Sequence, residues 1–236
     1  MSMEIRTFGN CNSERILIQM VDDHDLEVIE NEVAHIKSGD FRLITVKVNN
    51  WNTDLSPWTA PPVFGNTPFG EGAADTLSLL TRSIIPSLGC SRAELFIGGY
   101  SLAGLFALWA ACNTSIFRGV VAASPSVWFP GFADYVKNNP VRTQAVYLSL
   151  GDREEKTRNP VMATVGNAIR EVHETISEQG VECTLEWNEG NHFREPDLRT
   201  AKGFSWVLEQ TGKVHAQTGK AHRQLYTDKQ SACTAR

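Results

Sequence analysis

Residues 94–104 read Glu94-Leu95-Phe96-Ile97-Gly98-Gly99-Tyr100-Ser101-Leu102-Ala103-Gly104. A short apolar strand here breaks into glycines, presents one serine and continues into an apolar segment of helical period. Small residues flank Ser101, as a tight strand-to-helix turn requires, because the serine backbone is strained there and neighbouring strands leave little room. A serine in this setting is typical of a hydrolase nucleophile, with its hydroxyl exposed at the edge of the sheet.

The helix predicted over residues 102–111 directs free N–H groups and its positive end toward that serine. A carbonyl oxygen that becomes negative there would meet the Leu102 N–H, so we expect Leu102 to supply half of an oxyanion hole. The alternatives are a close-packed strand–helix junction and a glycine-rich phosphate loop. Residues 98–104 lack the lysine of a phosphate loop and the Gly-x-Gly-x-x-Gly spacing of a dinucleotide loop.

The chain has 236 residues and a formal net charge of −5. This length fits one domain with a full α/β core, and the charge predicts neither nucleic acid nor a membrane as partner. Residues 1–6 lack the apolar region of a signal peptide and no apolar stretch could span a bilayer, so we expect a cytoplasmic protein. The cysteines are scattered and lack Cys-x-x-Cys spacing, which argues against a disulfide framework and a zinc site. They are Cys11, Cys90, Cys112, Cys183 and Cys233.

Apolar runs rich in β-branched residues alternate along the chain with segments of helical period. This alternation predicts an α/β fold, with a mostly parallel central sheet and helices on both faces. The expected strands are 16–20, 43–48, 95–98, 119–123, 146–150 and 183–187, and the expected helices are 26–36, 73–85, 102–111, 161–177 and 197–209. Gly39, Gly180 and Gly212 are expected to end three of these helices.

Residues 49–72 combine Trp51, Trp58 and Phe69 with prolines, glycines and asparagines. The stretch is too apolar for a solvated linker and too rich in proline for a regular element. We expect it to fold over one end of the sheet as a pocket wall, with plain packing as the alternative. Residues 1–212 then form one domain, and the polar residues 213–236 form a loosely attached C-terminal tail.

A serine nucleophile needs a base to take its proton and an acid to orient that base. His192 follows the predicted strand 183–187 through a short loop. The C-terminal ends of parallel strands lie at one edge of the sheet, where ligands bind, so we expect His192 to meet Ser101. A surface histidine is the alternative. The other histidines lie in predicted helices, in the tail or in an acidic run: His24, His35, His173, His215 and His222.

The acid is expected in the loop after strand 146–150, which reads Gly151-Asp152-Arg153-Glu154-Glu155-Lys156. Glu154 is favoured because its longer side chain can reach across to His192, and Asp152, nearest the strand end, is the alternative. The remaining charges fit a solvated face. Ser101, Glu154 and His192 follow one another in the serine-acid-histidine order of α/β-hydrolases.

Four motifs together carry a resemblance to a known family. They are Gly99-Tyr100-Ser101-Leu102-Ala103-Gly104, Ser124-Pro125-Ser126-Val127-Trp128, Gly151-Asp152-Arg153-Glu154 and Gly190-Asn191-His192-Phe193. With them the chain resembles, over roughly residues 15–210, the α/β-hydrolase esterases that include esterase D-like and enterochelin-esterase-like proteins. The resemblance implies an α/β-hydrolase fold without a separate lid domain, and ester hydrolysis through an acyl-enzyme with no metal or organic cofactor. It also implies that Trp51, Trp58 and Trp128 line the substrate pocket.

The chain departs from the pattern of that family at two places. Ala103 stands where many hydrolases have glycine. The second oxyanion donor normally comes from a His-Gly loop after the third strand, but here strand 16–20 runs into Val21-Asp22-Asp23-His24-Asp25. By position the donor is the Val21 N–H, although the carboxylates beside it would oppose an oxyanion unless they turn away. A metal site is not expected in this run, because adjacent residues cannot all converge on one ion, and Asp25 fits the N-cap of helix 26–36.

These features predict a serine esterase that acts on a small-molecule carboxylic ester. Ser101 would attack the acyl carbon, His192 would take and return the proton, Glu154 would orient His192, and Leu102 and Val21 would hold the oxyanion. One alternative is a catalytically inactive hydrolase-like binding protein, which the acidic loop 21–25 suggests. The other is an acyltransferase or thioesterase that uses the same triad.

Overall fold

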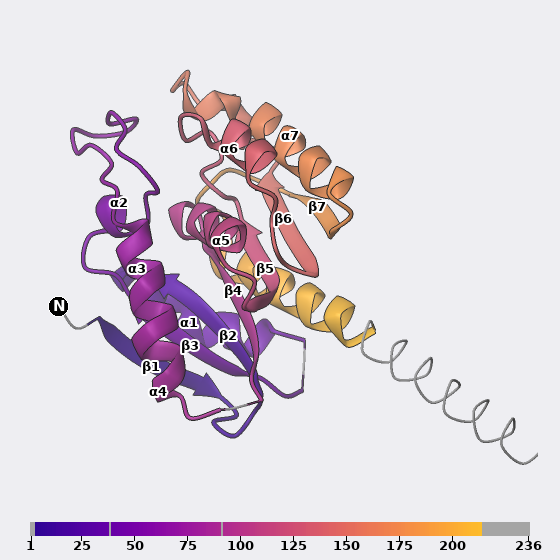
Figure 1. The fold of residues 1–236 in the computed structure, drawn as a ribbon. Coiled ribbons are helices and arrows are strands. Elements are labelled where there is room, and N and C mark those ends of the chain that lie inside the picture. Colours follow the sequence, from indigo (N-terminus) through magenta and orange to yellow (C-terminus); the bar gives the residue numbers. More distant parts are fainter. Residues whose placement is uncertain (1–2, 38, 91, 214–236) are drawn as a thin grey trace, which may run out of the picture.

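The computed structural model describes residues 3–37, 39–90 and 92–213. These residues form a seven-stranded sheet of order β1-β3-β2-β4-β5-β6-β7 (Figure 1). Every neighbouring pair is parallel except β1 and β3, which are antiparallel. The strands are β1 (Glu4–Gly9), β2 (Arg15–Val21), β3 (Arg42–Lys47), β4 (Glu94–Tyr100), β5 (Phe117–Ala123), β6 (Ala145–Gly151) and β7 (Glu182–Asn188). The predicted α/β architecture with a mostly parallel sheet is confirmed.

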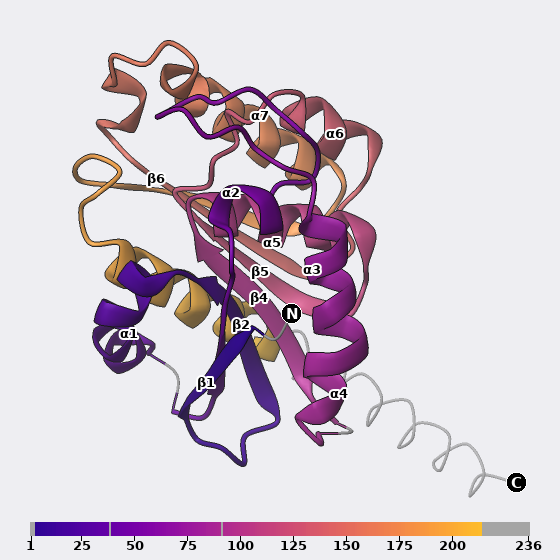
Figure 2. The ribbon, with the colours of Figure 1, turned by 90° about the vertical axis from the view of Figure 1, so that its left-hand side faces the viewer.

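Helices cover both faces of the sheet. They are α1 (Asp23–His35), α2 (Trp51–Asp54), α3 (Ala73–Leu79), α4 (Ile85–Ser87), α5 (Leu102–Asn113), α6 (Phe132–Asn138), α7 (Val165–Glu178) and the helix 196–213. A π-helical turn, Leu80–Ile84, joins α3 to α4, and two 3₁₀ turns, Glu154–Lys156 and Met162–Thr164, precede α7. Helices α3, α5 and α7 lie on one face, and α1 and the helix 196–213 lie on the other (Figures 1 and 2).

Helix α5 begins directly after Ser101 and lies in the helical layer that α3 and α7 also form on one face of the sheet. All of its residues from Leu102 to Cys112 are buried, which fits a helix that is apolar all round. Helix α7 instead has an apolar stripe of Val165, Ile169, Val172 and Ile176, and these four side chains are buried. The two helices therefore have different environments: α5 is buried on all sides, and α7 buries only one face.

The helix 196–213 packs on the opposite face through a glycine. A Cβ at Gly203 would lie 2.3 Å from the Val121 Cγ1 and 2.7 Å from the Tyr147 Cδ1. Only a residue without a side chain allows the helix to approach β5 and β6 so closely. This approach brings the first turn of the helix against the C-terminal ends of the strands.

Several expectations differ from the structure. Strand β1 and helix α6 were not predicted; β1 is mostly exposed and therefore lacks the apolar run of the inner strands. Gly180 follows α7 with a φ of 78°, as expected, but Gly212 lies inside the helix 196–213 and does not end it. Residues 49–72 do lie over one end of the sheet, and they include α2 and a bridge between Ala60 and Phe69. Of the predicted tail, residues 214–236 lie outside the described residues.

Candidate active site

Ser101 lies at the turn between β4 and α5, with a φ of 57° and a ψ of −119°. A non-glycine residue rarely adopts such a backbone conformation, which costs on the order of 1–3 kcal/mol and occurs mainly at functional sites. The Ser101 N–H donates to the Ala123 carbonyl at 3.0 Å, and its carbonyl accepts from the Leu105 N–H at 3.1 Å. These hydrogen bonds fix the strained turn between the end of β5 and the first turn of α5.

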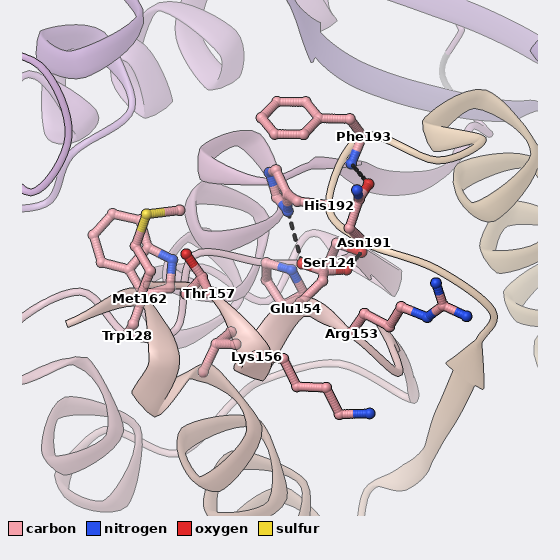
Figure 3. A pocket seen from close by; sticks show the side chains of 12 residues that line it. Ser124, Trp128, Arg153, Glu154, Lys156, Thr157, Met162, Asn191, His192 and Phe193 are labelled. Carbon is pink, nitrogen blue, oxygen red and sulfur yellow. Dashed lines mark hydrogen bonds and ion pairs between the residues drawn. The ribbon is translucent and has the colours of Figure 1, made fainter. Parts of the chain in front are cut away.

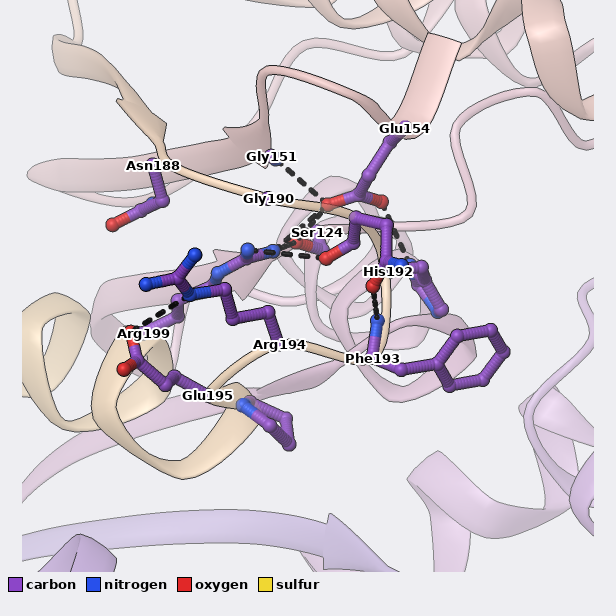
Figure 4. Close-up of polar contacts among 12 residues, drawn as sticks. Ser124, Gly151, Glu154, Asn188, Gly190, His192, Phe193, Arg194, Glu195 and Arg199 are labelled. Carbon is purple, nitrogen blue, oxygen red and sulfur yellow. Dashed lines mark hydrogen bonds and ion pairs between the residues drawn. The ribbon is translucent and has the colours of Figure 1, made fainter. Parts of the chain in front are cut away.

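A chain of hydrogen bonds runs from Ser101 to Glu154. The His192 Nε2 lies 3.0 Å from the Ser101 Oγ. The His192 Nδ1 lies 2.7 Å from the Glu154 Oε2 (Figure 4). Asp152, the alternative acid, instead accepts from the Gly190 N–H at 2.8 Å. The structure thus brings together Ser101, His192 and Glu154, and leaves Asp152 to tie the loop after β6 to the loop after β7.

The Glu154 side chain is only 5% exposed. Its Oε1 accepts from the Gly151 N–H at 2.7 Å, from the Ser124 hydroxyl at 2.7 Å and from the Arg199 Nη1 at 2.9 Å. Burial raises the pKa of Glu154, but the hydrogen bonds and charge of His192, and the hydrogen bonds from Ser124 and Gly151, outweigh it and hold that pKa below its ordinary value. The carboxylate is therefore ionised at neutral pH although it is buried.

Two hydroxyl groups from the loop after β5 contact the two ends of this series of hydrogen bonds, Ser101 and Glu154. The Ser126 Oγ lies 3.3 Å from the Ser101 Oγ, and the Ser126 N–H donates to the Ser101 carbonyl at 3.1 Å. Ser124, whose φ is 43°, holds its hydroxyl against Glu154. Both serines belong to the motif 124–128, but the sequence alone gave them no role, because neither stands on a recognisable turn of its own.

Leu102 is the first residue of α5, so its N–H is one of the helix donors that have no acceptor within the helix. Val21 is placed differently. Its carbonyl accepts from the Val48 N–H at 3.1 Å, and in a parallel ladder the N–H and the carbonyl of one residue face the same neighbouring strand. The Val21 N–H is therefore directed toward β3 and away from Ser101, which does not favour Val21 as an oxyanion donor.

The acidic run after β2 forms a helix cap. Asp22 is the N-cap of α1; its side chain accepts from the Asp25 N–H at 2.9 Å, and the Asp25 side chain accepts from the Asp22 N–H at 3.1 Å. The cap is thus Asp22, with Asp25 as its reciprocal partner, and not Asp25 as expected. Within residues 3–37, 39–90 and 92–213, no group of three His, Cys, Asp or Glu side chains is placed to hold a metal ion.

A cavity of about 310 Å³ opens beside His192 and Glu154 (Figure 3). Trp128, Met162 and Val165 supply apolar lining, and the side chains of Arg153 and Lys156 extend away from His192. The wall continues behind Trp128 as an aromatic cluster, because Phe64 and Phe69 pack edge-on against the Trp128 ring. Of the three predicted pocket tryptophans, Trp128 is the one that lines this cavity.

Trp58 and Trp51 have other surroundings. The Trp58 indole N–H donates to the Pro130 carbonyl at 3.0 Å, and its ring packs against Phe129 and Tyr135. Trp51 begins α2 and is partly buried against the apolar core between the sheet and helices α3, α5 and α7. Within residues 49–72, Trp58 therefore packs around the loop after β5, whereas Phe64 and Phe69 lie behind Trp128 in the cavity wall.

Arg199 was missed by sequence reasoning, although its side chain is 2% exposed and contacts Glu154 directly. It lies in the first turn of the helix 196–213, among charged residues that are typical of a solvated helix start. Tyr100 had no predicted role beyond its place next to Ser101, but its hydroxyl donates to the His192 carbonyl at 2.7 Å. No sequence signal distinguishes such a buried arginine from an exposed one.

No protein-family model matches the chain, and no curated protein sequence matches it. Several solved structures do match the chain. An IroE-like serine hydrolase from Shewanella oneidensis matches with a TM-score of 0.71 at 13% identity, over 86% of this chain and 74% of that one. The siderophore hydrolase EstA from Aspergillus nidulans matches with a TM-score of 0.65 at 16% identity, over 87% and 94%.

The enterobactin esterase FES from Shigella flexneri matches with a TM-score of 0.59 at 12% identity, over 89% of this chain and 60% of that one. No helix among the described residues of this chain is long and apolar enough to cross a membrane. The strand order, the strained turn at Ser101 and these likenesses agree on the architecture. The chain has the α/β-hydrolase fold.

Proposed function

We propose that this protein is a serine esterase that hydrolyses carboxylic esters through an acyl-enzyme. Ser101 is the nucleophile, His192 is the general base and acid, and Glu154 orients His192. The observation that carries the proposal is the unbroken chain of hydrogen bonds from the Glu154 carboxylate through both nitrogens of His192 to the Ser101 hydroxyl, at 2.7 Å and 3.0 Å. Such a chain positions a base to take the serine proton as the hydroxyl attacks.

The reaction proceeds in two halves. The Ser101 Oγ bonds to the acyl carbon while its proton passes to the His192 Nε2, and the oxyanion that forms accepts a hydrogen bond from the Leu102 N–H. When the ester bond breaks, the same proton passes to the alcohol, which leaves. Water then attacks the acyl-enzyme, His192 takes and returns its proton, and the acid is released. Glu154 stays ionised throughout and stabilises the imidazolium of His192.

The surroundings of the triad support an ester with an apolar part. The cavity of about 310 Å³ beside His192 is lined by Trp128, Met162 and Val165, which would hold an acyl or alcohol group of moderate size. The matched structures are those of a serine hydrolase, a siderophore hydrolase and an enterobactin esterase, which agrees with ester chemistry on this fold.

A fluorophosphonate probe and a series of p-nitrophenyl esters test the proposal. We expect the wild-type protein to be labelled at Ser101 and to release p-nitrophenol. Ser101→Ala should abolish labelling and lower kcat by at least about 10⁴-fold, whereas Ser177→Ala, an exposed serine on α7, should leave both unchanged. A folded wild-type protein that neither reacts with the probe nor hydrolyses any ester would instead indicate a hydrolase-like binding protein.

Product analysis separates hydrolysis from acyl transfer. The same reaction is run with the ester alone and with a competing alcohol or thiol. Free acid as the main product under both conditions supports an esterase. A predominant new ester or thioester would show that the acyl-enzyme prefers a nucleophile other than water, and the protein would then be an acyltransferase.

A further inference from the structure

Arg199 is a buried charged side chain to which the proposed reaction gives no role. It comes from the first turn of the helix 196–213, seven residues beyond His192, and its guanidinium lies behind Glu154 on the side away from His192 (Figure 4). Removing a guanidinium from water is unfavourable unless hydrogen bonds and an opposite charge compensate for it. The hydrogen-bond acceptors of Arg199 therefore show which groups its buried guanidinium holds in place.

The two terminal nitrogens of Arg199 carry four N–H groups and lie within hydrogen-bond distance of five acceptors among the described residues, so Nη1 shares one N–H between two acceptors. Each nitrogen serves a different part of the site. Nη1 contacts side chains and Nη2 contacts backbone carbonyls. The acceptors of Nη1 are Glu154 Oε1 at 2.9 Å, Ser124 Oγ at 3.0 Å and Tyr100 OH at 3.1 Å. The acceptors of Nη2 are the carbonyls of Glu189 and Asn191, both at 3.1 Å.

These acceptors lie on the loops that carry the proposed triad. Asn191 precedes His192 directly, and Tyr100 precedes Ser101 directly. The Tyr100 hydroxyl also donates to the His192 carbonyl at 2.7 Å, so Arg199 reaches the backbone of His192 by a second route. The planar guanidinium holds its two terminal nitrogens at a fixed separation, and one rigid group thus sets the spacing between the acid, the base and the serine turn.

The Glu154 carboxylate divides its two oxygens between Arg199 and His192. Oε1 accepts from Arg199 and Oε2 faces the His192 Nδ1. While Oε1 is held by a group that carries a permanent positive charge, the carboxylate cannot rotate away from the imidazole without losing a charge-assisted hydrogen bond. A lysine could hold Glu154 or the loop carbonyls, but its single ammonium could not hold both in this geometry.

We infer that Arg199 is the positioning residue of this site, and this inference rests on the proposed esterase function. It acts through Glu154 and the His192 loop and does not touch the substrate. Its loss would leave the apolar cavity lining and the hydrogen bonds of Ser101 to Ala123 and Leu105 in place, while the imidazole lost its fixed orientation. The effect should therefore fall on kcat, because a small misplacement of a reacting group can lower a rate by up to about 10²-fold.

The experiment compares Arg199→Gln, Arg199→Lys and Arg194→Gln in the full chain. Arg194 is the matched control, because it lies on the loop that carries His192, is 47% exposed and pairs with Glu189 at the surface. Far-ultraviolet circular dichroism establishes that each variant is folded, and kcat and KM are measured with one p-nitrophenyl ester. We expect Arg199→Gln to lower kcat roughly 10- to 100-fold with KM within about twofold, Arg199→Lys to restore part of kcat, and Arg194→Gln to behave as wild type.

A double-mutant cycle with Glu154→Gln separates positioning from a general loss of structure. If Arg199 acts through Glu154 and the His192 loop, Arg199→Gln should lower kcat by a clearly smaller factor in the Glu154→Gln background than in the wild-type background. An equal decrease in both backgrounds, or an unchanged kcat in folded Arg199→Gln, would overturn the inference. If Arg199→Gln does not fold, Tyr100→Phe takes its place, and an unchanged kcat in both Tyr100→Phe and Arg199→Lys would overturn it.

A proton NMR measurement gives a readout that does not depend on activity. A short hydrogen bond between the His192 Nδ1–H and Glu154 should give a downfield imidazole proton signal that Glu154→Gln removes. Arg199→Gln should broaden or shift this signal, and Arg194→Gln should not. An unchanged signal in Arg199→Gln refutes the positioning role even where the protein hydrolyses esters; a protein with the expected signal changes but no hydrolysis refutes the proposed function alone.

Discussion

Gly99 and Ala103 approach each other so closely that a Cβ on Gly99 would lie 2.5 Å from the Cβ of Ala103. This contact closes the turn that holds Ser101 at a φ of 57°. Gly99→Ala should therefore displace α5 from β4, lower the free energy of unfolding by about 1–3 kcal/mol and reduce esterase activity at least tenfold. Urea unfolding and kcat measurements check this expectation.

Gly212→Ala is the matched control for that substitution. Gly212 lies in the helix 196–213, and a Cβ there would meet no atom within 4 Å. Alanine favours the helix over glycine, so the free energy of unfolding should rise by up to about 1 kcal/mol with no change in kcat. A loss of activity in Gly212→Ala equal to that in Gly99→Ala would contradict a local effect at the serine turn.

Glu154 and Asp152 should differ sharply in their effect on the reaction. In the proposed mechanism Glu154→Gln removes the charge that orients His192 and stabilises the imidazolium, and in a serine protease the equivalent change lowers kcat by about 10⁴-fold. We expect a decrease of about 10³- to 10⁴-fold here. Asp152→Asn retains an oxygen that can accept from the Gly190 N–H, so its kcat should stay within about threefold of wild type. Stopped-flow or steady-state hydrolysis of the same ester measures both.

Trp128 and Trp58 should separate substrate preference from stability. Trp128→Ala opens the cavity wall beside His192, so kcat/KM for bulky or aromatic acyl esters should fall about tenfold or more, with little change for an acetyl ester. Trp58→Ala removes a hydrogen bond to Pro130 and ring contacts away from the cavity. It should lower the free energy of unfolding by about 2 kcal/mol and leave the acyl preference unchanged. A panel of p-nitrophenyl esters with thermal unfolding tests the pair.

Asp25 should make stability depend on pH. Burial, and then the charge of Asp22, raise the pKa of Asp25 from 3.8 to about 6. The folded protein thus binds this proton more tightly than the unfolded chain. The stability that this proton confers is fully present below about pH 3.8 and is lost as the pH rises through 6.

Asp25→Asn stays neutral at every pH, and its amide oxygen can still accept from the Asp22 N–H. Above pH 6 it should therefore exceed wild type in free energy of unfolding by on the order of 1–2 kcal/mol, and the difference should shrink toward pH 4. Urea unfolding between pH 4 and 8 measures this. Glu27→Gln, whose carboxylate is exposed on the same helix, should show no such dependence.

The sequence predicted the sheet because its inner strands are apolar runs between helical segments, and this signal is local. It placed Ser101 and His192 at one edge of the sheet for the same reason: both follow parallel strands, β4 and β7. Strand β1 escaped prediction since an exposed edge strand has no such run. Whether Glu154 or Asp152 contacts His192 depends on the conformation of the loop after β6. The spacing of the strands in the sequence does not determine that conformation.

Arg199 and Trp58 both have an environment that the local sequence does not predict. Arg199 carries a charge in a polar stretch and is nevertheless buried, because Gly203 lets its helix approach the sheet. Trp58 lies in an aromatic loop that suggested a pocket wall and nevertheless packs on Phe129 and Tyr135. In both residues the environment is set by a partner far away in the chain, which composition and period do not report.

The hydrogen bonds between Ser101, Glu154 and the segment 192–199 have a consequence for protein synthesis. Ser101 and His192 are 91 residues apart, so at about 5–20 residues per second the ribosome adds Ser101 roughly 5–20 s before it adds His192. During that interval the nascent chain contains Ser101 but neither the imidazole of His192 nor the helix that carries Arg199. A ribosome-bound chain that ends before residue 192 should therefore be unable to react with cellular esters, and reactivity toward them would arise only when the helix 196–213 docks on the sheet.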